Sequence, residues 1–324
     1  MYLVTGGSGF LGQALVKQLS ALGHGVRVLD RESPANPLAG VEYIQGDLLD
    51  EEALFSAIRG VSGVYHLAAI PHLWSPDPGL FERVNAQGTC RVVEACLQQA
   101  SQPRLVHVSS ESIYLASGWD KIGNELPRYA NMVGPYTRSK WKAHLRVLDA
   151  VQLHGLEACV VVPSTPIGTE DPHETPPTRM LKDFAQRKHP AYLDCLLNLV
   201  TVEEVVGVLI GVMDHGSPGE TYLANRQAWW MHEILDLLQR ELNIRKPKLR
   251  IPYSMALSYA FLAERIGYRV FAKAPPASME AVRLAKHPLA LVAAHPTPAG
   301  NAHDPPALKD TLLRTAASFR QTDA

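Results

Sequence analysis

The stretch TGGSGFLG, Thr5–Gly12, joins an apolar run at Tyr2–Thr5 to an amphipathic helical pattern at Phe10–Leu22. Its glycines follow the spacing GxxGxxG and are Gly6, Gly9 and Gly12. Small residues at such positions let the backbone approach a pyrophosphate, and the start of the helix adds positive partial charge. A strand, a glycine-rich turn and a helix in this order predict the first unit of a parallel sheet that binds a dinucleotide.

Outward from this turn, short apolar runs bounded by Gly and Asp alternate with longer helical patterns through the first half of the chain. Such alternation is typical of βαβ units, so we predict an α/β fold with a Rossmann-type, doubly wound parallel sheet. Strands are predicted at Tyr2–Thr5, Val26–Asp30, Glu42–Ile44, Gly63–Leu67, Arg104–Ser109 and Glu157–Val162. Helices are predicted at Phe10–Leu22, Glu51–Arg59, Leu80–Ala100 and Tyr136–His154.

The alternation ends in a proline-rich stretch at Pro163–Pro177, which is followed by a helix near Thr178–Arg187. Strands at Leu196–Val200 and Glu220–Leu223 are expected to return to the main sheet. We assign residues 1–163, with 195–225 returning, to the dinucleotide-binding domain. Residues 164–194 and 226–324 are assigned to a smaller, mostly helical substrate lobe, because ligands in open α/β folds bind beyond the carboxyl ends of the strands.

The composition argues against a nucleic-acid surface, a metal site and a membrane span. The 324 residues are 46% hydrophobic, with a formal net charge of -1 and charges of both signs mixed along the chain, so no nucleic-acid surface is predicted. The four cysteines show no CxxC pair, which favours reduced thiols and no metal site. The apolar stretch Met255–Leu262 is followed by Glu264 and Arg265 and falls short of the roughly 18 residues that indicate a membrane span.

The first strand begins at Tyr2, which leaves no room for a signal peptide, and we expect a cytoplasmic protein.

Asp30 ends the second strand, where a carboxylate can accept hydrogen bonds from ribose hydroxyls. It should repel a 2′-phosphate, whereas Arg31 could pair with one. We favour NAD(H) over NADP(H). Asp47, after the third strand, is either a helix-capping turn residue or an acceptor for the adenine amino group.

Tyr136 and Lys140 stand four residues apart, so a helix places both on one face. An ammonium beside a phenol lowers the phenol's pKa from its reference value of about 10, which would let Tyr136 exchange a proton with an alcohol or ketone oxygen. A strand that ends in Ser109-Ser110 precedes this helix. Ser110 or Ser109 could hydrogen-bond the substrate oxygen there.

These residues resemble the extended short-chain dehydrogenases/reductases. The matching motifs are TGGSGFLG at 5–12, Gly46-Asp47-Leu48, His66-Leu67-Ala68-Ala69, Asn85-Ala86-Gln87-Gly88-Thr89, Ser109-Ser110 four positions before Tyr114, and Tyr136-Thr137-Arg138-Ser139-Lys140. The resemblance implies a catalytic trio of Ser110, Tyr136 and Lys140. It also implies cofactor contacts from Phe10, Leu11, Asp47, Leu48, Leu67, Ala68, Ala69, Asn85, Val108 and Pro163, together with Tyr136 and Lys140. For Asn85, a helix N-cap is an equally good interpretation.

Within that family, the segment Val162–Gly168 is similar to a branch with hopanoid-associated sugar epimerases, dihydroflavonol reductases and 3-beta-hydroxysteroid dehydrogenase-like proteins. This similarity fades after about Pro252, and members usually carry a Lys-Ala…Glu-Leu-Gly-Tyr segment where this chain has His295–Pro306. In nucleotide-sugar enzymes of the family an arginine that pairs with the substrate pyrophosphate stands at the position of Leu197. Its absence favours a less charged, more apolar substrate.

Sugar dehydratases of the family carry an Asp-Glu pair where this chain has Glu111-Ser112, so 4,6-dehydration is disfavoured. Glu111 could be an accessory acid or base, although a solvated loop carboxylate is the favoured interpretation. His72 and Trp74 follow the fourth strand and are expected near the nicotinamide, where they offer surface to a substrate.

The working hypothesis is an enzyme that transfers a hydride between NAD(P)(H) and a secondary alcohol or ketone on a fairly apolar small molecule. An NAD-dependent sugar epimerase with tightly bound cofactor is the alternative. A non-catalytic NAD(P)-sensing protein is a third possibility, but such proteins commonly lose the tyrosine that Tyr136 provides. By analogy with the family, helices at Leu80–Ala100 and Tyr136–His154 could form a homodimer contact.

Overall fold

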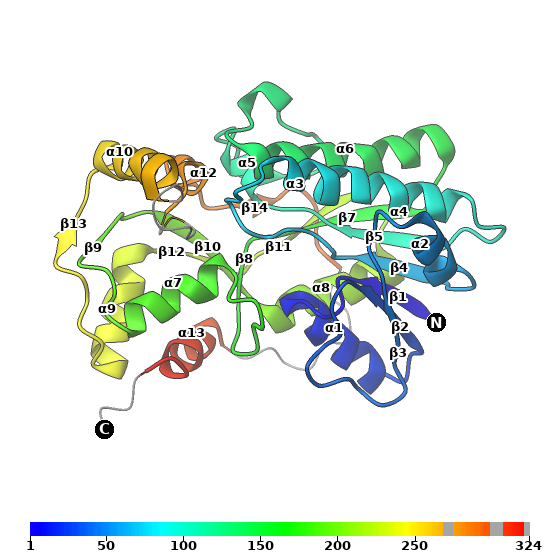
Figure 1. The fold of residues 1–324 in the computed structure, drawn as a ribbon, viewed down its shortest axis with the longest axis horizontal. Coiled ribbons are helices and arrows are strands. Elements are labelled where there is room, and N and C mark those ends of the chain that lie inside the picture. Colours follow the sequence, from blue (N-terminus) through cyan, green and yellow to red (C-terminus); the bar gives the residue numbers. More distant parts are fainter. Residues whose placement is uncertain (268–274, 276, 299–306, 321–324) are drawn as a thin grey trace.

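The computed structural model describes residues 1–267, 275, 277–298 and 307–320. Its main sheet has seven strands in the order β11-β7-β5-β4-β1-β2-β3, and every neighbouring pair is parallel (Figure 1). The strands are β1 (Tyr2–Thr5), β2 (Val26–Asp30), β3 (Glu42–Gln45), β4 (Gly63–His66), β5 (Arg104–Val108), β7 (Ala158–Pro163) and β11 (Thr221–Ala224). The predicted Rossmann-type parallel sheet is therefore confirmed.

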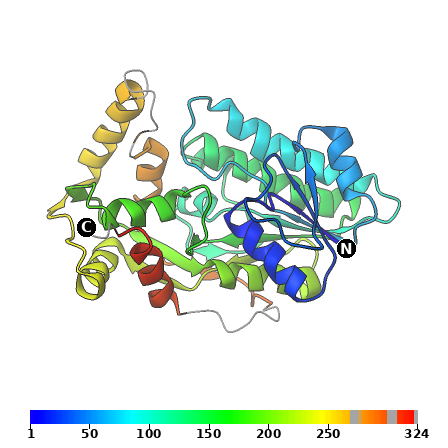
Figure 2. The same ribbon diagram turned by 60° about the horizontal axis from the view of Figure 1, so that its bottom comes forward.

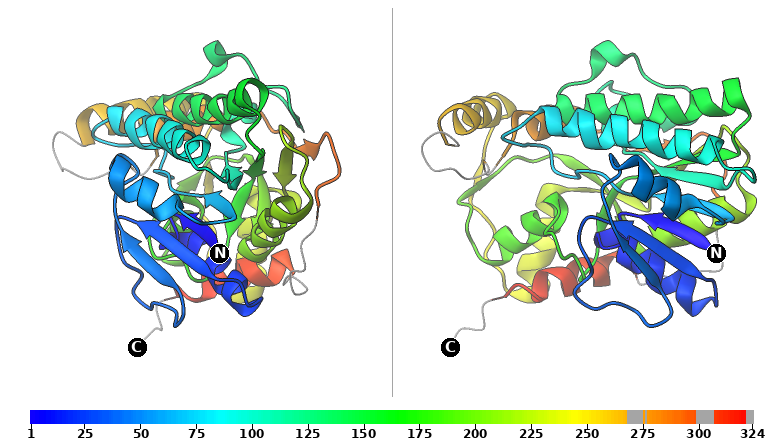
Figure 3. Two further views of the ribbon diagram at one scale, coloured as in Figure 1. Left: turned by 90° about the vertical axis from the view of Figure 1, so that its right-hand side faces the viewer. Right: turned by 45° about the vertical axis from the view of Figure 1, so that its right-hand side comes forward.

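Helices cover both faces of this sheet, as Figure 2 and the two views of Figure 3 show. One face carries α1 (Phe10–Ala21) and α8 (Val202–His215), and the other carries α2 (Glu51–Ile58), α4 (Gly88–Leu97) and α6 (Pro135–His154). Strands between two helical layers must be apolar on both sides. Accordingly, all six residues of β7, with the sequence ACVVVP, are buried.

The segment predicted as one helix at Leu80–Ala100 is built in three parts. A short α3 (Gly79–Phe81) runs into the π-helix η1 (Glu82–Gln87), which continues into α4. Ion pairs join this segment to α6 through Lys142 and Glu82, and through Arg146 and Glu94. The homodimer suggested for these helices stays a prediction.

The strand order determines where a ligand site can form. Successive crossovers run from β1 to β2 and β3 on one side, and from β4 to β5, β7 and β11 on the other. The connections diverge between β1 and β4, and ligands of open α/β sheets bind at the carboxyl edge beside such a point. That edge brings together the turn after β1, the segment 67–69, Ser109-Ser110 and Pro163.

The second lobe contains strands as well as helices. A three-stranded sheet is formed by β8 (Thr165–Ile167), β10 (Leu196–Thr201) and β12 (Gln227–Trp230). The expectation that the strand near Leu196 returns to the main sheet is wrong, because β10 pairs with β8 and β12. By contrast, β11 does return and pairs with β7.

Helices α7 (Pro176–Ala185), α9 (Met231–Leu242) and α13 (Leu308–Ala317) enclose the core of this lobe. Helices α10 (Tyr253–Leu262) and α12 (Met279–Leu284) pack together beside it. The remaining described elements are α5 (Ser112–Leu115), β6 (Lys121–Ile122), η2 (Tyr129–Asn131), β9 (Ala191–Tyr192), β13 (Leu249–Arg250), η3 (Ala263–Gly267) and β14 (Val292–Ala293). Residues 299–306 of the divergent segment His295–Pro306 lie outside the described residues.

None of the helices built from the described residues combines the length and the apolar character that crossing a bilayer requires.

Replacing Gly12 by alanine should destabilise the fold. The added Cβ would fall on the Gly6 carbonyl oxygen and within 2.7 Å of the Gly7 Cα, and both are backbone atoms that cannot rotate away. We expect the free energy of unfolding in urea to fall by about 2 kcal/mol or more, the cost of overpacking a tight contact. Gly9→Ala, whose Cβ would lie 3.3 Å from the same oxygen, is the control and should lose less. Parent-like stability of Gly12→Ala would contradict this packing.

Candidate active site

The glycine turn after β1 lies against the backbone that follows β4. Gly6 has a φ of 72°, and a Cβ there would lie 2.7 Å from both the N and the Cα of Ala68. Only glycine tolerates both the left-handed backbone and this close approach. Gly9 is the N-cap residue of α1 and provides no side-chain cap. The first N–H groups of α1 are therefore left for an anionic group.

Asp30 connects this turn to the end of β2. Its carboxylate accepts hydrogen bonds from the backbone N–H of Ser8 at 2.9 Å and from that of Glu32 at 3.3 Å. A carboxylate has about four acceptor positions, so Asp30 can accept further bonds. The neighbouring Arg31 is exposed.

The turn after β3 excludes helix capping as a role of Asp47. Its carboxylate accepts a hydrogen bond from the N–H of Leu49 at 3.0 Å, whereas the N-cap of α2 is Asp50. Asp47 is therefore a turn residue but not the helix cap. The role as an adenine acceptor stays a prediction, and Leu48 beside it is buried.

Lys140 lies one turn after Tyr136 on α6 and points to the end of β5. Its Nζ donates a hydrogen bond to the carbonyl oxygen of Val108 at 2.7 Å. Lys140 is buried, and burial lowers its pKa to about 8. The ammonium is therefore close to its titration point at neutral pH, which is uncommon for lysine.

Three buried histidines surround this lysine, a feature that the sequence analysis missed. His66 pairs with Thr5 and Thr89, while His144 pairs with Ser109 and Thr221. Burial, followed by the charge of Lys140, lowers the pKa of His66 and of His144 to about 3. The pKa of His107 is lowered for the same reasons and by the other two histidines. The lysine thus lies beside imidazoles that are neutral at pH 7.

Ser110, rather than Ser109, is the hydroxyl beside Tyr136. Ser109 is occupied with His144 at 3.0 Å, whereas Ser110 forms a hydrogen bond with the Tyr136 side chain. The Ser110 Oγ also donates to the Ser112 Oγ at 2.9 Å. The strand end and the helix therefore present two hydroxyl groups at one point.

The pKa of Tyr136 differs from the expectation that Lys140 would lower it. Burial raises this pKa to about 12; the hydrogen bond with Ser110 lowers it, and the charges of Glu280 and Glu111 raise it further. The phenol is half-buried, with its ring edge-on to Phe81. The protein by itself thus keeps Tyr136 protonated at neutral pH.

The start of α6 is anchored by a residue from the second lobe. Glu280, on α12, accepts hydrogen bonds from the backbone N–H groups of Tyr136 at 3.1 Å and Thr137 at 2.7 Å. A carboxylate at a helix N-terminus satisfies N–H groups that lack partners and interacts favourably with the helix dipole. A side chain at Gly134 would collide with this carboxylate. The sequence analysis missed Glu280; only Gly134-Pro135, a typical helix start, signalled that a cap was needed.

Glu111 is buried, so its interpretation as a solvated loop carboxylate is wrong. Its Oε1 accepts a hydrogen bond from Thr165 Oγ1 at 2.8 Å, and Asn198 donates another. Its Oε2 is buried without a hydrogen-bond partner among the described residues. Burial raises the pKa of Glu111 to about 8, so the group is mostly an uncharged acid at neutral pH.

Asn85 lies within η1, which excludes its alternative as a helix N-cap. Its amide oxygen accepts a hydrogen bond from the N–H of Ile70 at 2.7 Å, and its amide nitrogen donates to Ser139 Oγ at 3.0 Å. Asn85 therefore joins the loop after β4 to α6. A π-turn at this point is consistent with a position near a site, where such turns are frequent.

The residues predicted to contact substrate have different surroundings, and that role stays a prediction. His72 is exposed. The charges of His173 and Asp171 affect the pKa of His72, so its loop faces the loop before α7. Trp74 lies further along the same loop and is half-buried. Leu197 is half-buried on β10, where it pairs with Trp229 and packs on the lobe core. Pro163 ends β7 and its carbonyl accepts from the Glu111 N–H.

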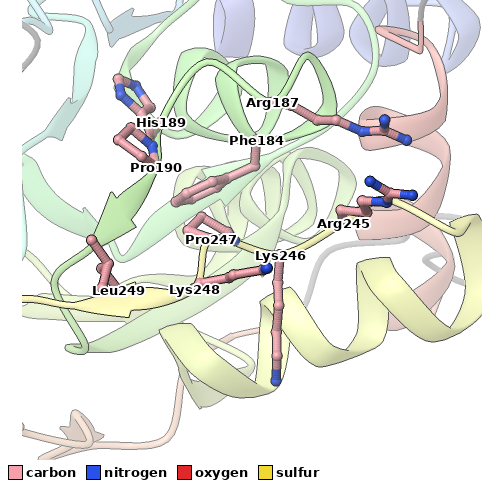
Figure 4. Close-up of a pocket in the computed structure, with 9 residues that line it drawn as sticks. All are labelled: Phe184, Arg187, His189, Pro190, Arg245, Lys246, Pro247, Lys248 and Leu249. Atoms are coloured by element: carbon pink, nitrogen blue, oxygen red, sulfur yellow. The ribbon is translucent and has the colours of Figure 1, made fainter.

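A cavity of about 500 Å³ lies elsewhere, between the end of α7 and the segment 245–249 (Figure 4). None of the residues that line it is a predicted site residue. The titratable groups that can move protons gather at the carboxyl edge of the main sheet, and that edge is the better candidate for chemistry.

Comparisons with known proteins identify relatives of this chain. The model of the NAD dependent epimerase/dehydratase family matches residues 2–224. A Synechocystis protein provisionally named dihydroflavonol 4-reductase is 31% identical over 292 residues, which cover 87% of this chain and 84% of that protein. The Mus musculus sterol-4-alpha-carboxylate 3-dehydrogenase, decarboxylating, is 33% identical over 272 residues, or 80% of this chain and 73% of that protein. A solved structure titled as that of gox2253 aligns with a TM-score of 0.75, 25% identity, and coverage of 98% and 97%.

Replacing Glu111 by glutamine should remove one source of pH-dependent stability. In the folded protein the pKa of Glu111 is raised to about 8, whereas an unfolded glutamate titrates near 4.3. Between these values the folded state retains a proton that the unfolded state has lost, so the free energy of unfolding falls as pH rises. Relative to the parent, Glu111→Gln should gain about 1.4 kcal/mol per pH unit between about pH 5 and pH 8.

Urea unfolding at stepped pH values measures this difference. Glu125→Gln, at an exposed position, is the matched control and should show no such trend. A constant difference between Glu111→Gln and the parent across the window would show that Glu111 titrates normally.

Proposed function

The chain belongs to the NAD dependent epimerase/dehydratase family, within the extended short-chain dehydrogenases/reductases, and on this basis we propose that it interconverts a secondary alcohol and a ketone. The family consists of NAD-dependent dehydrogenases, reductases and epimerases, so the chain is an enzyme. The proposed substrate is a fairly apolar small molecule and the proposed cofactor is NAD(H).

The described residues suit a dinucleotide. The left-handed Gly6 and the uncapped start of α1 form a small-residue cradle for a pyrophosphate, and Asp30 offers free acceptor capacity at the end of β2. The proposed contacts also include Phe10, Leu11, Leu48, Asn85 and the segment 67–69. When bound, NAD(H) supplies or accepts the hydride. The carboxylate of Asp30 favours NAD(H), because it would repel a 2′-phosphate.

Three side chains carry the proposed proton chemistry. Ser110 hydrogen-bonds the substrate oxygen and holds it beside Tyr136. Tyr136 donates its phenolic proton to the carbonyl oxygen as the carbonyl carbon receives a hydride, which yields the alcohol. Oxidation is the reverse, with Tyr136 accepting the proton. Lys140 binds the nicotinamide ribose and provides the positive charge that stabilises the phenolate.

The convergence of Ser110, Tyr136 and Lys140 supports this proposal. Ser110 forms a hydrogen bond with the Tyr136 side chain, and Lys140 lies one turn further along α6 with its Nζ bound to the carbonyl oxygen at the end of β5. Burial raises the pKa of Tyr136 to about 12, so the phenol is protonated at neutral pH, as an ordinary tyrosine would be, and can act as the proton donor in reduction. Oxidation requires a lower pKa, which the positive charges of Lys140 and of an oxidised nicotinamide would both promote.

The substrate class is supported by Leu197 and by one relative. Leu197 offers no charge at the position where nucleotide-sugar enzymes carry an arginine. The mouse relative is named for oxidation at the 3-position of a sterol carboxylate, a mostly apolar secondary alcohol. We therefore propose a substrate that is mainly apolar rather than a nucleotide sugar.

A cofactor-consumption screen tests the function. Absorbance of the reduced nicotinamide is followed with NADH and NADPH against ketones of graded polarity. Turnover that increases with the apolar area of the ketone is the expected result. Tightly copurifying NAD with no net consumption would instead favour the epimerase, and cofactor binding without turnover of any ketone would favour a cofactor-sensing protein.

Replacing Tyr136 by phenylalanine should remove the proton donor while keeping the ring against Phe81. We expect kcat for ketone reduction to fall about 100-fold or more, the usual contribution of a general acid. Fluorescence titration should give a parent-like Kd for NADH. Tyr129→Phe is the control, since Tyr129 is exposed in η2. Parent-like reduction by Tyr136→Phe would overturn its assigned role.

Replacing Asp30 by alanine should shift cofactor preference toward NADPH. The change removes a negative charge beside the expected 2′-phosphate and also an acceptor for the ribose hydroxyls. The ratio of kcat/KM for NADPH to that for NADH should rise about tenfold or more, given the usual size of such charge effects. Arg31→Ala should move the ratio in the opposite direction. An unchanged ratio in Asp30→Ala would place the ribose elsewhere.

A further inference from the structure

Helix α10 exposes an unusual number of large apolar side chains. Met255 is 59% exposed, Tyr259 52%, Phe261 45% and Leu262 53%. Single exposed apolar residues are common on soluble proteins, but contiguous groups mark surfaces that meet another apolar phase. Figures 1 and 2 show α10 at the outer edge of the second lobe, away from the main sheet.

The side chains of α10 divide between a packed side and an exposed side. Met255, Tyr259 and Leu262 are spaced by four and three residues, so they form one exposed stripe along the helix. On the packed side, Ala256 and Ala260 are buried beside α12, and Tyr253 and Leu257 are half-buried against the same cluster. The exposed stripe is therefore additional to the apolar side that packs within the described part of the chain.

Positive charges flank this stripe. On β13, just before α10, the 63% exposed Leu249 stands between Lys248 and Arg250. Arg250 also forms an ion pair with the buried carboxylate of Asp194 at 3.3 Å, which offsets part of its charge. After α10, the guanidinium of Arg265 lies 5.4 Å from the centre of the Phe261 ring. Across residues 248–265, all of them described, the exposed charged side chains are cationic. The one acid, Glu264, is half-buried and accepts a hydrogen bond from the N–H of Met279.

The cavity in Figure 4 continues this character beyond β13. Lys248 and Leu249 form part of its wall, opposite Phe184 and Pro190. Arg187 and Arg245 extend from the lining toward one side of the view, while Lys246 turns away and pairs with Asp236. The surface from the cavity to α10 is therefore apolar with a cationic margin.

We propose that this surface, comprising Leu249, Met255, Tyr259, Phe261 and Leu262 with Lys248, Arg250 and Arg265, docks the protein onto an anionic lipid bilayer. Apolar side chains on one helix face enter the boundary between headgroups and acyl chains, and neighbouring cations attract anionic headgroups. A second copy of the chain is a poorer occupant, because a two-fold contact would bring the same cations face to face.

This surface lies close to the candidate active site. Helix α10 packs on α12, and α12 carries Glu280, which binds the backbone of Tyr136. The docking surface and the proposed catalytic helix are therefore separated by one short helix. Apolar substrates concentrate in bilayers, and docking here would place the site close to their supply. Binding to lipid is measured without turnover, so its test is independent of the proposed function.

Vesicle flotation tests the proposal. The full chain is mixed with vesicles of phosphatidylcholine containing about one quarter phosphatidylglycerol, or with vesicles of phosphatidylcholine alone. We expect binding to the anionic vesicles. The combined variant Met255→Ser, Tyr259→Ser and Leu262→Ser should lower the partition coefficient about tenfold or more, through lost apolar insertion. The variant Leu22→Ser with Leu153→Ser, at residues 40% and 69% exposed at the C-cap of α1 and on α6, is the matched control and should bind like the parent.

A charge variant tests the cationic residues of the surface. Lys248→Gln with Arg265→Gln should also lower binding to anionic vesicles about tenfold or more, and added salt should weaken parent binding. Circular dichroism melting curves should stay parent-like for every variant, because the changed side chains are exposed.

Three results would overturn the proposal. The parent could fail to float with anionic vesicles, or the α10 variant could bind as well as the parent. Light scattering could also show a dimer that becomes monomeric in the α10 variant, with no vesicle binding, which would assign the surface to self-association.

Discussion

The contact between the backbone of Gly6 and the backbone of Ala68 is the constraint on which the candidate site depends. It joins the turn after β1 to the segment after β4, the two neighbouring strands at which the sheet reverses its order of connection. β1 pairs with β4 and β4 pairs with β5, both in parallel, so the carboxyl ends of these strands lie along one edge of the sheet. The uncapped start of α1 and the end of β5 therefore lie at the same edge.

Burial then determines what the groups at this edge can do. Lys140 and Tyr136 are ordinary residues in sequence, yet removal from water lowers the pKa of the lysine to about 8 and raises that of the tyrosine to about 12. Glu111 responds in the same sense and becomes a mostly neutral acid. The charged form of each group is destabilised, because a buried site replaces few of the hydrogen bonds that water provides. At neutral pH, Tyr136 and Glu111 are therefore mostly neutral, whereas Lys140 keeps most of its positive charge.

The second lobe completes the site through a few long-range contacts. Glu280 binds the first N–H groups of α6, and Thr165 and Asn198 reach Glu111 from the three-stranded sheet. Hydrogen bonds of this kind couple the orientation of the lobe to the position of Tyr136. The apolar outer face of α10 belongs to the same lobe and is separated from Glu280 by the packing of α10 on α12. A contact at that face would therefore lie near the start of α6.

The sequence by itself determined the parallel sheet, the glycine turn and the pairing of Tyr136 with Lys140. Each is encoded locally, by residue period, by backbone freedom at glycine or by a four-residue helical spacing. Tertiary structure alone decided that β10 leaves the main sheet, that Glu111 is buried, and that Glu280 anchors α6 from 143 positions beyond Thr137. Strand pairing and burial depend on which distant surfaces pack together, and no local pattern records that choice.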